Sequence, residues 1–195
     1  MCLGPDFFAR SPLTVAAELI GAVLHLRQDD AVCSGRIVET EAYAGDDDPA
    51  SHAYRGPTPR NAVMFGPPGV VYVYFIYGVH HCLNIVTGPE GTPGAVLIRA
   101  VEPLDGLEAM KRRRDRDRDR GLTNGPGKLC EAFGVDRRLN GLDLGPGIGP
   151  ALWITQPPDR PRVTATSRIG LSRAVDRLWR FIDPDSRHLS RPAGS

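Results

Sequence analysis

The sequence predicts an α+β fold, a single domain built on a curved, mostly antiparallel β-sheet with flanking helices. Strand-like runs follow one another through the first half of the chain, and clusters of Gly and Pro separate them. Because strands joined without intervening helices pair as neighbours, this order favours a mixed sheet over a doubly wound one. At 195 residues and 41% hydrophobic content, the chain is typical of one globular domain.

The first element is a short amphipathic helix. Ser11 followed by Pro12 is typical of an N-cap and a first helical position, and Leu13, Ala16, Ala17 and Ile20 follow at helical spacing. We expect this helix to end near Gly21.

Five strands and two further helices follow. The strands are expected at Ala22–Leu26, Gly35–Tyr43, Val70–Ile76, Leu83–Val86 and Ala95–Val101. The helices are expected at Leu104–Arg114 and Pro126–Phe133, the second stopped by Gly134. From Ser186 to Ser195 the chain is expected to be a loose tail.

Composition limits the class of protein. The chain has no signal-peptide pattern at its start and no apolar run long enough to cross a membrane, which predicts an intracellular protein. Its four cysteines are widely scattered, so neither a zinc site nor a disulfide framework is indicated. A net charge of +1 argues weakly against nucleic acid, yet residues 111–120 and 160–180 are rich in arginine. These two stretches either face phosphates or form a solvated helix or linker.

The run GRIVETEAY places two carboxylates inside a strand. Alternation puts Glu39, Glu41 and Tyr43 on one face of it. A buried carboxylate must be paired, hydrogen-bonded or shifted in pKa, and a catalytic role is one common reason to accept that cost. An edge strand whose glutamates face water is the other interpretation, and nine residues do not decide between them.

The aromatic run YVYFIYG is the second unusual feature. Tyr72 and Tyr74 share one face of the expected strand, and Tyr77 stands directly before Gly78, where the strand turns. A ring at a turn tip can wedge into a base stack, while Tyr43, Tyr74 and His52 can stack on an extruded base. The alternative is an ordinary core strand with aromatic packing.

Other motifs are weaker. GPGKL at Gly125–Leu129 lacks the leading glycine and the Ser or Thr of a phosphate loop, so it is either a plain helix start or a phosphate contact aided by Lys128. His80, His81 and Cys82 alternate faces on a strand and do not have metal-ligand spacing. Asp46, Asp47 and Asp48 are most simply a polar loop.

Taken together, these motifs resemble the alkyladenine DNA glycosylase family, also called 3-methyladenine DNA glycosylases. The resemblance covers nearly the whole chain and rests on GRIVETEAY, His52, TPRN, MF, YVYFIYG, Asn84, LIRAVEPLDG, GPGKLC and RIG, in that order. It departs from the family in a longer loop between Asn84 and Arg99 and in Ser172, where a glycine is usual.

The resemblance implies roles for individual residues. Glu41 would be the general base that deprotonates a water for attack on the sugar C1′, with Glu39 in support, while Arg99 and the backbone carbonyl of Ile169 would hold that water. The remaining implied roles fall on Tyr43, His52 and Tyr74 around the flipped base, Asn84 against the amino group of guanine, Tyr77 as the residue that fills the gap in the duplex, and Thr58, Arg60 and Lys128 as phosphate contacts.

The implied protein is a monofunctional base excision repair glycosylase without metal or cofactor. It would hydrolyse alkylated or deaminated purines from damaged double-stranded DNA as a cytoplasmic, nucleoid-associated monomer. Lys111 and Lys128 are its only lysines and lie outside the candidate pocket motifs, which argues against a Schiff-base lyase. One rival is a noncatalytic nucleic-acid-binding module, since the fold is similar to a tRNA-contacting domain of formyltransferases. Another is a metal-dependent hydrolase.

Overall fold

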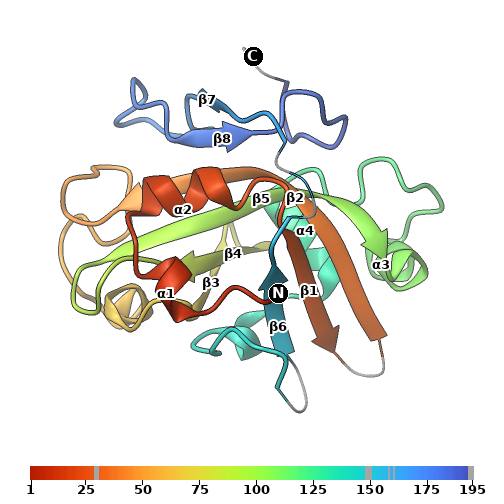
Figure 1. Ribbon diagram of the computed structural model, residues 1–195, viewed down its shortest axis with the longest axis horizontal. Coiled ribbons are helices and arrows are strands. Elements are labelled where there is room, and N and C mark those ends of the chain that lie inside the picture. The colour runs from red at the N-terminus through yellow and green to blue at the C-terminus, as the bar shows by residue number, and fades with distance from the viewer. Residues whose placement is uncertain (29–30, 148–150, 158, 160, 193–195) are drawn as a thin grey trace.

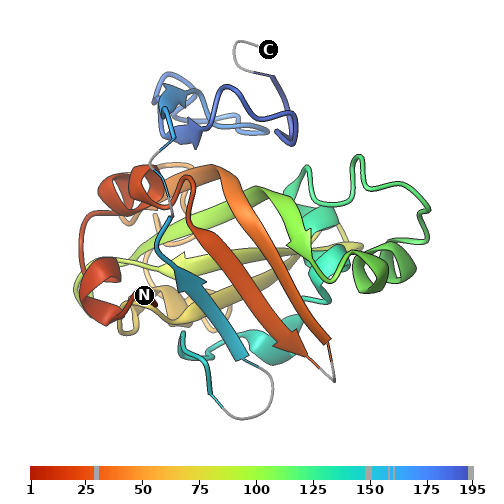
Figure 2. The same ribbon diagram turned by 45° about the vertical axis from the view of Figure 1, so that its right-hand side comes forward.

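The computed structural model describes residues 1–28, 31–147, 151–157, 159 and 161–192. Its centre is one curled sheet in the order β3-β4-β5-β2-β1-β6, with β8 pairing both β2 and β7, and every pair is antiparallel (Figures 1 and 2). The strands are β1 Val23–Gln28, β2 Ala31–Ala44, β3 Val71–Ile76, β4 His80–Val86, β5 Gly94–Asp105, β6 Ala151–Thr155, β7 Thr164–Thr166 and β8 Arg180–Ile182. The predicted α+β class is confirmed.

The helices are short. They are α1 Pro5–Phe8, α2 Pro12–Glu18, α3 Leu107–Arg114 and α4 Pro126–Phe133, with 3-10 turns η1 Ala62–Phe65 and η2 Arg137–Leu139. The Ser11 side chain accepts a hydrogen bond from the Leu13 N–H, as its position before Pro12 predicts. Among the described helices, none is long and apolar enough to cross a membrane.

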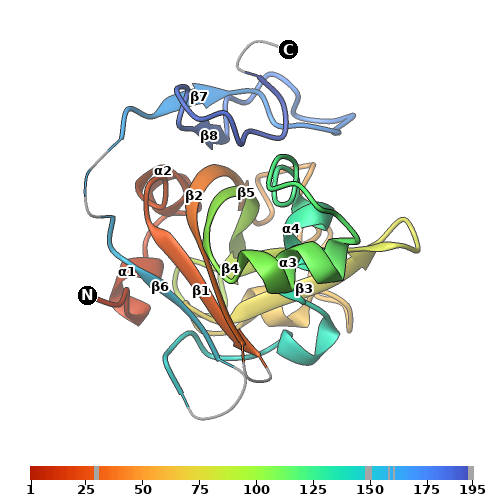
Figure 3. The same cartoon turned by 90° about the vertical axis from the view of Figure 1, so that its right-hand side faces the viewer.

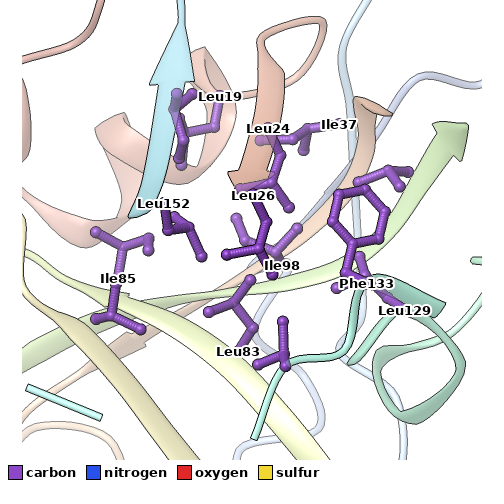
Figure 4. Packing of buried hydrophobic residues seen from close by; sticks show 14 of the residues in the cluster. Leu19, Leu24, Leu26, Ile37, Leu83, Ile85, Ile98, Leu129, Phe133 and Leu152 are labelled. Carbon is purple, nitrogen blue, oxygen red and sulfur yellow. The ribbon is translucent and has the colours of Figure 1, made fainter. Parts of the chain in front are cut away.

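Alternation along the strands gives the sheet two different faces. The core face carries Val71 and Val73 of β3, Leu83 and Ile85 of β4, and Val96 and Ile98 of β5, which pack with α4 and the strands β1 and β6 around the main core (Figure 4). The residues between them, including Tyr72, Asn84 and Leu97, point to the opposite side, which we call the site face. A smaller apolar cluster around Met64 lies on that side.

The β3–β4 hairpin turns at Tyr77 and Gly78, both with positive φ (55° and 69°). This tip projects beyond the body of the molecule (Figure 3). Glycine adopts such angles freely, whereas Tyr77 is one of only three non-glycine residues with positive φ in the described ranges.

The C-terminal segment differs from the expected loose tail. The backbone N–H of Ser190 donates to Glu39 at 2.7 Å, and the carbonyl of Arg191 accepts from Arg180 at 2.6 Å. The segment is therefore attached to the centre of the molecule as far as Arg191, while the last three residues of the expected tail lie outside the described residues.

Candidate active site

The strand register places four residues in one row across the site face. Tyr72 of β3 pairs with Asn84 of β4, Asn84 with Leu97 of β5, and Leu97 with Glu41 of β2. Because paired residues in antiparallel strands project to the same side, motifs far apart in the sequence meet here.

Glu41 is fully buried, and three donors hold its carboxylate. Oε2 accepts from the hydroxyl of Tyr43 (2.8 Å) and from Nη1 of Arg99 (3.2 Å), while Oε1 accepts from the backbone N–H of Ile169 (2.7 Å). Burial and the neighbouring Glu41 carboxylate together raise the pKa of Tyr43 well above its usual value, so this phenol stays protonated and donates. Ile169 thus contacts Glu41 through its backbone N–H, whereas the role expected for Ile169 falls on its backbone carbonyl.

Glu39 lies beside Glu41 and is also fully buried. Its Oε1 accepts from Nε of Arg99 (2.9 Å), Nε of Arg180 (2.8 Å) and the Ser190 hydroxyl (2.7 Å). Although burial acts to raise the pKa of Glu39, the two arginines and Ser190 outweigh it and lower that pKa. Glu39, Glu41, Arg99 and Arg180 thus form a buried cluster without net charge, and the edge-strand alternative is wrong.

A cavity of about 300 Å³ opens next to Glu41. Its wall includes all of the predicted ring-binding residues and both residues predicted to hold a water; the lining is Tyr43, Ala50, His52, Met64, Tyr72, Tyr74, Ile76, Tyr77, His80, Cys82, Asn84, Ala95, Leu97, Arg99, Pro126, Gly127, Ile169, Gly170 and Leu171. Glu41 is fully buried and is not itself part of this lining, but the three residues that donate to its carboxylate, Tyr43, Arg99 and Ile169, all line the cavity.

The aromatic wall is neutral. His52 packs edge-on against Tyr74, with ring centroids 4.4 Å apart, and its Nδ1 is 3.1 Å from the hydroxyl of Tyr72. Burial, helped by the nearby Arg60, lowers the pKa of His52, so its imidazole is uncharged at neutral pH. Burial also raises the pKa of Tyr72 to about 12 and that of Tyr74 further.

Asn84 is 3% exposed and lines the cavity. Its Nδ2 donates to the carbonyls of Tyr72 (3.2 Å) and Cys82 (3.4 Å). Since both amide hydrogens have acceptors, the group that Asn84 can offer to a ligand is its Oδ1.

The predicted DNA-contacting residues surround the cavity. Tyr77, at the hairpin tip, is 81% exposed and also reaches the cavity wall. Arg60 donates to the carbonyl of Phe75, and Thr58 lies beside a second hollow that shares His52 with the first. Lys128 is exposed at the start of α4, next to the lining residue Gly127. Gly127 packs closely against His80, because a Cβ at position 127 would lie 2.8 Å from the His80 ring.

Several residues of the site were given no functional role in the sequence analysis. Tyr72 lines the cavity, and its alternation with Tyr74 was a signal that it shares that face. Asp48, expected in a polar loop, is fully buried and paired with Arg168 (2.7 Å). Arg168 in turn lies over the ring of Tyr43, with its guanidinium carbon 4.7 Å from the ring centroid. The Asp48–Arg168 pair therefore packs against the ring of Tyr43, one of the residues that line the cavity.

In the described part of the chain, no three His, Cys, Asp or Glu residues come close enough together to hold a metal ion. His80 is exposed beside the cavity, and the His81 ring lies at a tilted angle to that of Phe75, with ring centroids 4.9 Å apart. The functional geometry is therefore concentrated at the carboxylate cluster and the aromatic cavity.

A buried carboxylate next to an aromatic-lined cavity of about 300 Å³, with the tip of a projecting hairpin in the cavity wall, defines a class of site whose size and lining suit one planar ring. Comparison with known proteins gives the family. The methylpurine-DNA glycosylase family model matches residues 6–187, and the chain belongs to this family.

Similar proteins span nearly the same length. A protein of Rhodopseudomonas palustris is 51% identical over 186 residues, covering 95% of this chain and 86% of its own. One from Chlorobaculum tepidum is 46% identical over 192 residues (97% and 90%), and one from Methanoculleus marisnigri 45% identical over 196 residues (98% and 100%). All three are provisionally named 3-methyladenine DNA glycosylases.

Proposed function

We propose that this chain is a DNA glycosylase of base excision repair. It extrudes an alkylated or deaminated purine from duplex DNA into the aromatic cavity and hydrolyses its N-glycosidic bond with a water activated by Glu41, leaving an abasic site. The observation that carries the proposal is the fully buried Glu41 carboxylate, held by Tyr43, Arg99 and Ile169 where these three residues line the cavity.

The hydrogen-bond capacity of Glu41 fits a general base. An ionised carboxylate has about four acceptor sites, and the three protein donors leave one on Oε1 for a water. In the proposed step, Oε1 of Glu41 takes a proton from the water while the oxygen of the water bonds to C1′. The N-glycosidic bond breaks, and its electron pair leaves with the base. Arg99 and the Ile169 carbonyl are proposed to hold the water during this step.

The cavity suits one alkylated purine. Its volume of about 300 Å³ lies at the small end of ligand sites. Methylation at N3 or N7 gives the purine a positive charge, which makes it a good leaving group and attracts it to tyrosine faces. The uncharged imidazole of His52 avoids repelling this cation. A neutral lesion such as hypoxanthine needs a proton to leave, so we expect it to be released more slowly.

The proposed DNA interface surrounds the cavity. Tyr77 at the projecting tip would fill the space left by the extruded nucleotide, and Thr58, Arg60 and Lys128 would contact phosphates. Neither lysine lines the cavity in the described residues, and Lys128 Nζ donates to Asn124. This arrangement supports hydrolysis without a Schiff base and hence without strand cleavage.

The test uses one duplex that carries 7-methylguanine and one that carries hypoxanthine. We expect free base from the first, more slowly from the second, and intact strands until alkali is added. Binding without any base release would favour the noncatalytic module, and strand breaks before alkali would contradict the monofunctional mechanism. Inhibition by EDTA that added metal reverses would favour the metal-dependent hydrolase.

A further inference from the structure

The C-terminal segment reaches the carboxylate cluster through Ser190. The Ser190 hydroxyl donates to Glu39 Oε1 (2.7 Å) and lies 3.4 Å from Nη2 of Arg99, while its backbone N–H donates to Glu39 Oε2 (2.7 Å). Arg180 holds the same segment by donating to both Glu39 and the carbonyl of Arg191. Ser190 is thus attached to the partner of Glu41 from a position about 150 residues away along the chain.

Each of the three nitrogens of the Arg99 guanidinium has an acceptor of its own. Nε donates to Glu39, Nη1 to Glu41 and Nη2 to Ser190. A guanidinium is planar and rigid, so fixing Nε and Nη2 on one side determines where Nη1 points. The orientation of Arg99 toward Glu41 therefore depends on two residues that do not line the cavity.

Glu39 itself is fixed mainly by this arrangement. Its Oε2 accepts from the backbone N–H of Ser190, whereas its Oε1 accepts from Arg99, Arg180 and the Ser190 hydroxyl. Ser190 thus contacts both oxygens of Glu39 as well as Arg99. If the Ser190 hydroxyl is removed, Arg99 loses an acceptor and Glu39 loses a donor, although no charge in the buried cluster is removed.

We propose that Ser190 is a positioning residue for Glu41, which it orients through Glu39 and Arg99. The inference rests on the proposed function, because it assigns Ser190 a part in the same step. A general base acts efficiently only when it is held closely in its productive geometry, so a loosened Arg99 slows the proton transfer. Binding of DNA at the cavity mouth and hairpin does not involve Ser190 and is preserved.

The experiment measures base release from a 7-methylguanine duplex with enzyme in excess, together with affinity for a duplex carrying an abasic analogue. Ser190→Ala should slow release about tenfold, the scale of losing a hydrogen bond to a charged group, with unchanged affinity. Ser190→Thr, which keeps the hydroxyl, should restore most of the rate. Ser186→Ala is the matched control, because the Ser186 hydroxyl accepts from the nearby backbone N–H of His188 and lies in the same segment.

Thermal melts of all variants accompany the rates. If the wild-type chain and Ser190→Ala release base at the same rate, the positioning role is overturned and the proposed function is left intact. The positioning role would also be overturned if the release rate of Ser190→Ala decreased only in proportion to its folded fraction. The same holds if Ser190→Thr did not restore the rate. Absence of base release by the wild-type chain would overturn the function and this inference together.

Discussion

The core face and the site face of the same strands solve opposite problems. In β5, Val96 and Ile98 pack into an apolar core, whereas Leu97 and Arg99 face the cavity and the carboxylate cluster. The core face needs only apolar residues of suitable volume. The site face buries charged groups, and each must be paired because an unpaired buried charge is strongly destabilising.

This difference explains why the buried charged groups near the cavity are paired with one another. The Glu39, Glu41, Arg99 and Arg180 cluster and the separate Asp48–Arg168 pair have matched charges and are largely removed from water. Buried ion pairs are poor evidence for stability, since their desolvation cost is comparable to their attraction. Since stability does not account for these pairs, we interpret them as fixing the orientation of side chains next to the cavity, such as Glu41 and Tyr43.

The largest expected effect separates the two faces within one strand. Ile98→Ala should lower the free energy of unfolding by about 2–5 kcal/mol, because Ile98 is fully buried on the core face, and should leave the release rate per folded molecule unchanged. Leu97→Ala should cost less stability, because its side chain already borders a cavity, yet alter base release. Chemical denaturation and single-turnover rates measure both. The same profile in both variants would contradict the division into faces.

A smaller effect is expected at the edge of the site face. Tyr77→Ala should weaken binding to an abasic-analogue duplex by about tenfold or more, consistent with the loss of one aromatic stacking contact, with little change for undamaged DNA. Titrations with both duplexes provide the comparison. Val32→Ala serves as the control, because Val32 is an exposed apolar residue at the end of β2 far from Glu41. Equal losses on the two duplexes would exclude the wedge role of Tyr77.

The smallest effect concerns selectivity. Asn84→Ser should raise release of guanine or 7-methylguanine relative to alkylated adenine by about tenfold, because a shorter side chain gives the 2-amino group room. The lost contacts to the Tyr72 and Cys82 carbonyls should also lower the melting temperature slightly. A two-substrate excision ratio measured beside a melt separates these effects. A lower melt with an unchanged ratio would mean that Asn84 only supports the backbone.

The sequence predicted the parts of the fold that local patterns encode. The five long strands and the bounds of α4 follow from alternation, Gly and Pro signals, and a Gly134 C-cap with φ of 77°. The elements α1, β6, β7 and β8 were not predicted. With lengths of three to five residues, they are too short to show a period, and β7 and β8 are defined by pairing with each other and with β2.

The candidate site divides in the same way. Glu41, Arg99 and the ring-bearing residues lie in strongly patterned segments, and family resemblance placed them together. The pairings of Glu39 with Arg180 and Ser190, and of Asp48 with Arg168, join residues 120–151 positions apart. Such pairings depend on tertiary structure, which no local signal in one sequence specifies.

The central claim is that the buried Glu41 carboxylate activates water for base release. The most direct test measures single-turnover release of 7-methylguanine by Glu41→Gln, together with affinity for an abasic-analogue duplex. The amide keeps the shape but cannot accept a proton, so the account predicts a loss of about 10²-fold or more with affinity retained. Release by a folded Glu41→Gln variant at a rate comparable to that of the wild-type chain would contradict it.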